Sequence, residues 1–151
     1  MLANTLRMQQ AMADWMGPPQ KIASILFRRD GYLAANPDYA ARTLEVTVTM
    51  SEVAATGVTG TFANNYGVPP VTVFTKKNVQ APDAKALPNR APAEPWNFEI
   101  VFDTQFNYSG SRALLYELVV TNTSAPGKSY PLDASFTSPL AYGFHLSLIH
   151  I

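Results

Sequence analysis

TLEVTVTM, at residues 43–50, alternates strictly between polar and apolar side chains. Every second residue is apolar and the residues between are polar: Leu44, Val46, Val48 and Met50 against Thr43, Glu45, Thr47 and Thr49. Successive side chains of a β-strand point to opposite faces, so this period of two predicts a strand with one buried face. Each aliphatic side chain that it buries contributes about 1.5–3 kcal/mol.

Similar patterns recur on both sides of this segment, separated by stretches rich in Gly, Pro, Asn and Asp. Strands are predicted near residues 21–29, 43–50, 71–76, 97–104 and 113–122. The segment 21–29 is apolar on both faces, which is typical of a central strand. Residues 5–12 form a weaker strand pattern, and their Met and Ala content leaves a helix open.

Short strands joined by long Pro- and Gly-containing loops indicate an all-β fold, an antiparallel β-sandwich with a jelly-roll-like arrangement. The residues expected to face its interior are Leu44, Val46, Val48, Phe98, Ile100, Phe102, Leu114, Tyr116, Leu118 and Val120. We expect a single domain over residues 1–145, truncated at both ends.

Composition narrows the classes of function. The chain carries 11 basic and 11 acidic residues, so it offers no basic field for nucleic acid or an anionic membrane. It has no cysteine, which removes disulfides, thiolate nucleophiles and cysteine-based metal sites. No apolar run reaches the roughly 18 residues of a membrane-spanning helix. Charged residues make up 15% of the chain, below the usual share, and such compositions are common in extracellular β-proteins.

Several short segments resemble, in the same order, a group of uncharacterised secreted bacterial proteins, many of which carry a PEP-CTERM sorting tail. The matching segments are RMQQ (7–10), FRRDG (27–31), TFANNYG (61–67), TVF (72–74) and FNYSGSRALL (106–115). The resemblance extends over residues 7–136, although MADWMG departs from the usual pattern and NYSGSRALLYE lacks the usual proline. It implies an extracellular or cell-surface β-sandwich and assigns no catalytic residue.

The C-terminal segment LSLIHI, residues 146–151, back-translates as CTG TCT CTT ATA CAC ATC. That nucleotide sequence resembles the mosaic-end adapter of transposase-based sequencing libraries, as expected of a metagenomic fragment. We therefore expect a non-native tail, with a native final strand and any signal peptide or sorting tail missing; the alternative is a genuine final strand. The tail should either extend from the domain without packing on it or lie along an unpaired sheet edge. The two histidines, His145 and His150, should form no ligand pair.

Loop aromatics and asparagines are the candidate ligand contacts. Asn65 and Tyr66 in TFANNYG, Trp96 before a strand, and Tyr108 combine flat rings with polar groups that suit sugars. Asparagine also stabilises turns by bonding its own backbone, and Phe62 is expected to anchor the loop in the core. Loop packing without any ligand therefore remains the alternative for the same residues.

A calcium site is the one cofactor hypothesis. Asp30, Asn36 and Asp38 in RRDGYLAANPD offer the oxygen ligands that calcium prefers. Asx turns explain the same three residues without a metal.

Three functions are consistent with these features. The first is a non-catalytic, secreted cell-surface or extracellular-matrix module that binds polysaccharide. The second is a structural assembly subunit, a filament or coat protein, that uses strand-edge pairing. The third and weakest is a hydrolase with a carboxylate pair, for which Glu99, Asp103 and Glu117 are the candidates, although outward acids on strands are ordinarily solvated. We expect no enzyme, no nucleic-acid partner and no membrane-spanning segment.

Overall fold

Seven strands and two short 3-10 helices form the part of the chain that this computed structural model describes, residues 5–28, 39–54, 58–85, 96–128, 130, 132 and 147–150. The strands are β1 (Leu6–Met12), β2 (Gln20–Phe27), β3 (Arg42–Val53), β4 (Val71–Ala81), β5 (Phe98–Tyr108), β6 (Ala113–Thr123) and β7 (Ser147–His150). The helices are η1 (Ala13–Trp15) and η2 (Phe62–Asn65). The weak pattern at residues 5–12 is thus a strand.

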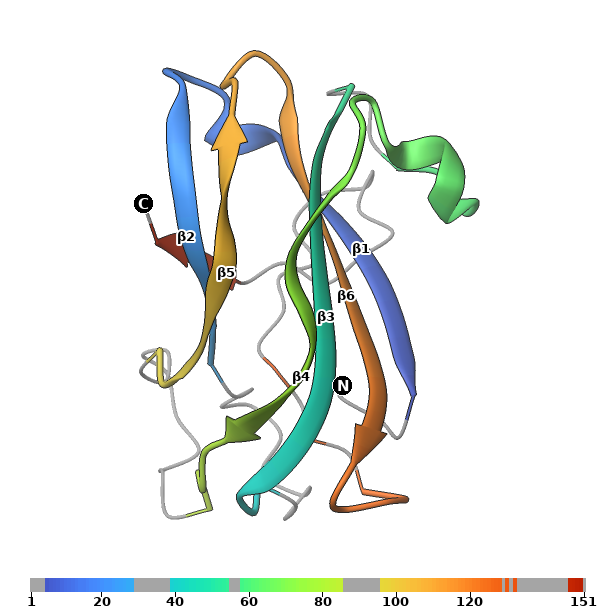
Figure 1. The fold of residues 1–151 in the computed structure, drawn as a ribbon, viewed down its shortest axis with the longest axis vertical. Coiled ribbons are helices and arrows are strands. Elements are labelled where there is room, and N and C mark those ends of the chain that lie inside the picture. The colour runs from blue at the N-terminus through green and yellow to red at the C-terminus, as the bar shows by residue number, and fades with distance from the viewer. Residues whose placement is uncertain are drawn as a thin grey trace.

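The strands form two antiparallel sheets that enclose a common core (Figure 1). One sheet has the order β1-β6-β3-β4, and the other has the order β5-β2-β7. The predicted all-β sandwich is therefore confirmed, and β2 is central in its sheet as its two apolar faces predicted. Within the tail, β7 pairs with β2 so that Leu148 lies opposite Leu26. The tail thus follows a sheet edge, one of its two expected arrangements, while its origin stays a prediction.

Strand β3 lies inside its sheet and pairs with β4 on one side and β6 on the other. Every residue predicted to face the interior is buried. On the opposite face of β3, Thr47 and Thr49 are only partly buried, and Glu99 on β5 is exposed. The alternation in the sequence therefore assigns the two faces of these strands correctly.

A bulge carries β4 past its predicted end at residue 76. Lys76 adopts φ +32°, and its backbone N–H donates to Thr47 Oγ1 at 3.2 Å in place of a ladder acceptor. The pairing register between β3 and β4 shifts between Val46 and Val48. Because a bulge absorbs extra residues and lets the ladder resume, the strand continues to Ala81.

An ion pair joins the two sheets along one side of the sandwich. Lys77 on β4 contacts the Asp103 carboxylate on β5, and the Thr75 backbone N–H donates to Asp103 Oδ2 at 3.2 Å. The hydrogen bond from Lys77, followed by that from Thr75, lowers the pKa of Asp103. Edge strands β4 and β5 are thereby held side by side.

Two glycines lock the connections at one end of the sandwich. Gly17 donates its N–H to Gly110 O at 2.9 Å, which ties the β1–β2 connection to the β5–β6 connection. Gly110 has φ +77°, and a Cβ placed there would lie 1.9 Å from Gly17 O. By contrast, Gly127 has φ +75° but faces open space. Position 110 therefore requires glycine for two independent reasons.

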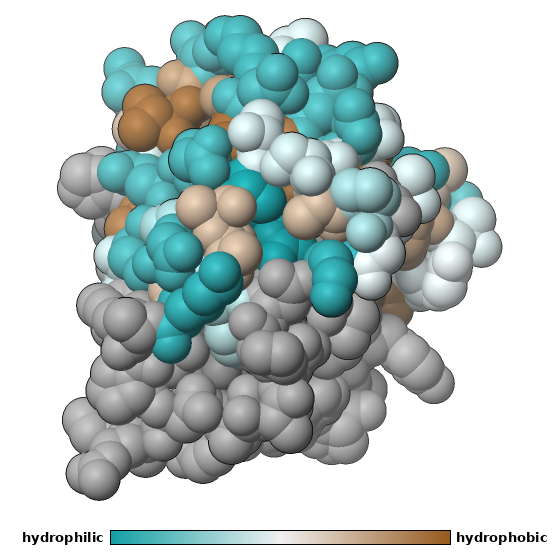
Figure 2. Space-filling model, turned by 90° about the horizontal axis from the view of Figure 1, so that it is seen from below, coloured by the Kyte–Doolittle hydropathy of each residue, from teal (hydrophilic) through white to brown (hydrophobic). Residues whose placement is uncertain are grey.

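A buried arginine occupies the other end, where β3 begins. Arg42 is 1% exposed and donates from Nη1 to Lys128 O at 3.1 Å. Its guanidinium lies 5.3 Å from the centre of the Tyr130 ring, and that ring makes an edge contact with Tyr39. Figure 2 looks at the molecule from this end, and the described residues there are mostly hydrophilic.

Neighbouring residues of β5 provide a direct test of the sandwich. Ile100 is 1% exposed and Val101 is 62% exposed. We expect Ile100→Ala to lower the free energy of unfolding by about 2–5 kcal/mol, because it leaves a cavity between the sheets. Val101→Ala should cost less than about 1 kcal/mol. Urea denaturation of both variants measures this, and equal losses would contradict the assigned faces.

Candidate functional site

The loop that contains TFANNYG packs on the outer face of the four-stranded sheet, away from the main core. Below it lies a second, smaller apolar cluster with Val53, Ala113 and Leu115 buried at its centre. Val58 and Tyr66 from the loop pack against this cluster, as does Ala11 from β1. The inner face of this sheet packs against the main core. At this end of β3 and β6 the loop also covers part of the outer face.

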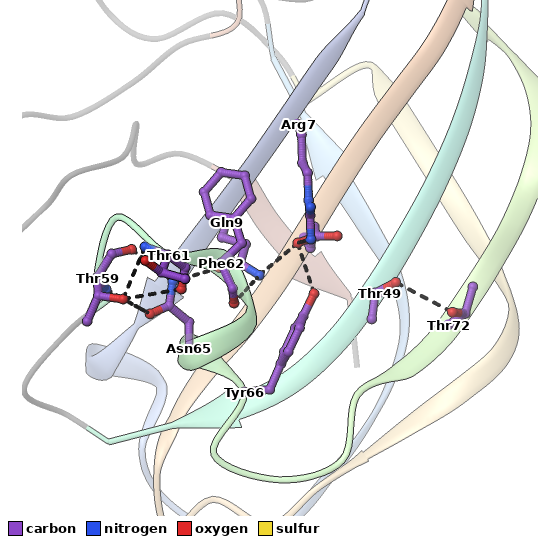
Figure 3. A network of polar contacts seen from close by, with 10 residues as sticks. Arg7, Gln9, Thr49, Thr59, Thr61, Phe62, Asn65, Tyr66 and Thr72 are labelled. Carbon is purple, nitrogen blue, oxygen red and sulfur yellow. Dashed lines mark hydrogen bonds and ion pairs between the residues drawn. The ribbon is translucent and has the colours of Figure 1, made fainter.

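Glu117 on β6 is the centre of the polar network that holds this loop, and Figure 3 shows its partners Arg7, Gln9 and Tyr66. Glu117 is 6% exposed, and its Oε2 accepts three hydrogen bonds. Arg7 Nη2 donates at 3.1 Å, Gln9 Nε2 at 2.7 Å, and the Tyr66 hydroxyl at 2.9 Å. A carboxylate can be buried only when donors replace the lost water, and these three residues supply them.

Asn65 fastens the loop a second time. Its side chain is 2% exposed, and Nδ2 donates to Gln9 Oε1 at 2.8 Å and to Thr59 O at 3.0 Å. Its Oδ1 accepts from the Thr59 backbone N–H at 2.7 Å and from Thr59 Oγ1 at 3.0 Å. The amide therefore bonds on both sides and is no longer available to a ligand.

Two expectations for this loop were wrong. Asn65 was expected to form part of an exposed contact surface, but it is buried because its amide bridges β1 and Thr59. Phe62 was expected to anchor the loop in the core, but it is only half-buried, with the Arg7 guanidinium 4.8 Å from the centre of its ring. A polar anchor thus takes the place of the predicted aromatic one, and Tyr66, half-buried over Glu117, is the aromatic residue at the site.

The network also shifts the ionisation of its members. The hydrogen bond to Glu117 raises the pKa of Arg7. Burial, and then the hydrogen bond to Glu117, raises the pKa of the Tyr66 hydroxyl. Both residues are thereby held in their protonated, donating states beside the carboxylate.

A row of polar side chains continues from this network across the sheet. The strand registers pair Gln9 with Glu117, Glu117 with Thr49, and Thr49 with Thr72, so that one residue from each strand stands in line. The hydroxyls of Thr49 and Thr72 lie 3.5 Å apart, beside the network in Figure 3. Gln9 and Glu117 are buried and bonded within the network, so Thr49 and Thr72 are the residues of the row that can offer hydroxyl groups to a ligand rich in hydroxyls.

The other predicted ligand contacts lie elsewhere. Tyr108 was expected in an exposed loop, but it ends β5, is 1% exposed, and donates its hydroxyl to Arg112 O at 2.6 Å. That expectation was wrong because Tyr108 falls on the inward face of its strand. Trp96 is half-buried before β5, with the Arg28 guanidinium 4.8 Å from its ring centre. The structure therefore brings together Asn65 and Tyr66 but not Trp96 or Tyr108.

The calcium hypothesis falls on Asp30, Asn36 and Asp38, which lie outside the described residues. Among the residues that the structure does describe, no three His, Cys, Asp or Glu side chains form a group suited to a metal ion.

Arg7 and Gln9 were not selected from the sequence, and Glu117 was named only for the carboxylate-pair hydrolase, with a solvated acid as the alternative; Glu117 is in fact buried. A signal for them was present, since RMQQ and TFANNYG both belong to the segments that carry the family resemblance. These segments are distant in sequence and meet in the structure through Gln9, Asn65 and Phe62, whose backbone oxygen accepts from Gln9 Nε2 at 3.2 Å.

Comparison with protein-family models finds no match, and comparisons with curated proteins and with solved structures find none either. The resemblance to secreted PEP-CTERM-type proteins therefore stays a prediction. In the described ranges, no helix has the length and apolar character needed to cross a membrane.

Neighbouring asparagines test the role of the buried amide. Asn65→Ala leaves Gln9 Oε1 without its donor and the Thr59 N–H without its acceptor, so we expect a loss of about 1–3 kcal/mol in the free energy of unfolding. Amide hydrogen exchange at Thr59 should also accelerate. Asn64 is exposed, and Asn64→Ala should change stability by less than about 0.5 kcal/mol. Equal effects of the two substitutions would contradict an anchoring role.

The raised pKa of Tyr66 predicts a specific pH dependence. Because the folded-state pKa lies above the unfolded value of about 10, the associated stability is complete below about pH 10 and is lost as pH rises through the folded-state pKa. The stability of the native chain should therefore fall more steeply than that of Tyr66→Phe above about pH 10. Tyrosinate absorbance and urea denaturation at matched pH measure this, and parallel curves would refute it.

Proposed function

We propose that the chain is a non-catalytic β-sandwich module of the cell surface or extracellular matrix that binds polysaccharide. The binding surface is the outer face of the four-stranded sheet beside the TFANNYG loop. The observation that carries the proposal is the polar row of Gln9, Glu117, Thr49 and Thr72, in which Glu117 fixes Tyr66 by a hydrogen bond beside the two threonines. Hydroxyl-rich ligands need such a combination of positioned polar groups and a flat ring.

The rigidity of this surface supports the proposal. Two separate anchors, Tyr66 on Glu117 and Asn65 on Gln9, hold the loop against the sheet. A surface that is already ordered loses less entropy when a ligand binds, which favours recognition of a flexible polymer. The composition and the resemblance to secreted proteins support an extracellular location.

The use of the buried carboxylates supports a non-catalytic role. Glu117 accepts from three donors around its own loop, and Glu52 accepts from the Ser109 backbone N–H at 2.8 Å and from Ser109 Oγ at 2.6 Å. Glycoside hydrolysis would instead need two carboxylates that face one substrate. Each of these two carboxylates holds a connection in place.

A second candidate function is that of an assembly subunit. The observation in its favour is the pairing of β7 with β2, in which residues 147–150 form an antiparallel ladder with residues 24–27. In an assembly, the strand that pairs with this edge of β2 would come from another copy in place of β7. An assembly of this kind would form species larger than the monomer in solution, whereas the binding module needs no such association.

Affinity electrophoresis in gels that contain soluble polysaccharides tests the binding function. We expect at least one neutral or acidic polysaccharide to retard the native chain. Thr49→Ala should weaken the interaction about threefold to tenfold, as for the loss of one hydrogen bond. Thr104→Ala is the matched control, because Thr104 is exposed on β5 of the other sheet. Retardation by no polysaccharide, or equal weakening by both substitutions, would contradict the proposal.

A further inference from the structure

Arg7 is an exposed arginine held in a fixed orientation. Its side chain is 51% exposed, although Nη2 donates to Glu117 Oε2 at 3.1 Å. The plane of its guanidinium is supported by Phe62, whose ring centre lies 4.8 Å from the guanidinium carbon. An arginine that is fixed by both a carboxylate and an aromatic ring loses little freedom when its other N–H groups bind a ligand.

The hydrogen-bonding capacity of this pair is only partly used. Within the described part of the chain, Nε and Nη1 of Arg7 make no hydrogen bond. Among the described residues, all three donors to Glu117 approach Oε2 and none approaches Oε1. Two charged donors and one carboxylate acceptor thus remain open at the edge of the polar row.

Any attraction of an anion to this site comes from nearby charges and not from the net charge of the chain. The chain has equal numbers of basic and acidic residues, so no general positive field attracts anions. On β4, the opposite edge strand of the same sheet, Lys76 is paired with Glu45 and Lys77 with Asp103. Lys76 and Lys77 are therefore engaged, and Arg7 is the cation that contacts the polar row at Glu117.

We propose that Arg7, Phe62 and Glu117 form a subsite for an anionic sugar residue of the polysaccharide. The carboxylate or sulfate of the sugar accepts hydrogen bonds from the guanidinium N–H groups of Arg7 that do not bind Glu117. A sugar hydroxyl donates to Glu117 Oε1, and the exposed part of the Phe62 ring packs against the sugar C–H groups. This inference rests on the proposed function, and it specifies the class of polymer that the sheet face selects.

The test compares Arg7→Gln with Lys85→Gln in the full chain. Both substitutions remove one positive charge, and Lys85 is exposed beyond the end of β4. Three probes are used in affinity electrophoresis at constant ionic strength: a polyuronate, a sulfated polysaccharide and a neutral glucan. We expect Arg7→Gln to weaken binding of the preferred acidic polymer about tenfold or more, as for the loss of charge-assisted hydrogen bonds, and Lys85→Gln to have little effect. Arg7→Lys should not restore binding, because an ammonium cannot reproduce the two-donor fork.

Each outcome has a distinct meaning. Stronger retardation by the polyuronate identifies a carboxylate ligand, and stronger retardation by the sulfated polymer identifies a sulfate ligand. Equal weakening by Arg7→Gln and Lys85→Gln, or none by either, overturns the anionic subsite. Binding of the neutral glucan that survives Arg7→Gln, without binding of either acidic polymer, overturns this inference but leaves the proposed function standing. Retardation by none of the three probes overturns both. Circular dichroism confirms that each variant is folded.

Discussion

The burial of one face of β3 is the constraint on which the rest of the molecule depends. Leu44, Val46 and Val48 are at most 1% exposed, and β3 carries neighbours on both edges. A strand paired on both sides cannot rotate to exchange its faces without breaking two ladders at once. Its polar residues are therefore directed to the outer face together, and that face becomes the platform on which the TFANNYG loop is placed.

Both ends of β3 also carry a buried charge. Arg42 at the start donates to a backbone carbonyl beyond β6, while Glu52 near the end accepts from Ser109 in the β5–β6 connection. Neither of these partners is a residue that pairs with β3 in the sheet. A buried charge without hydrogen-bond partners is energetically costly. Each of these side chains therefore requires its partner in a connection to stay in place, and so holds that connection against the core. The central strand thus organises the loops as well as the sheets.

The strands were predictable because their information is local. Alternation over a few residues assigns a face, and the faces of β3, β5 and β6 were assigned correctly. The bulge at Lys76 was not predictable, because it arises from a bond to Thr47 on another strand. The polar network could not be predicted from single segments either. Gln9, Asn65 and Glu117 lie far apart in sequence, and each by itself is typical of an ordinary loop or solvated-face residue. Only the spatial meeting of β1, β6 and the loop gives them a shared role.

The two glycines with positive φ differ in how much space surrounds them, and this decides what protein engineering can change at each position. At Gly110 the backbone of one connection presses on that of another, so an inserted peptide there would force apart two loops at once. Gly127 has the same backbone requirement, but a Cβ placed there would meet no atom within 4 Å. A side chain added at Gly127 therefore meets backbone strain alone, whereas one added at Gly110 also meets a steric clash with the neighbouring connection.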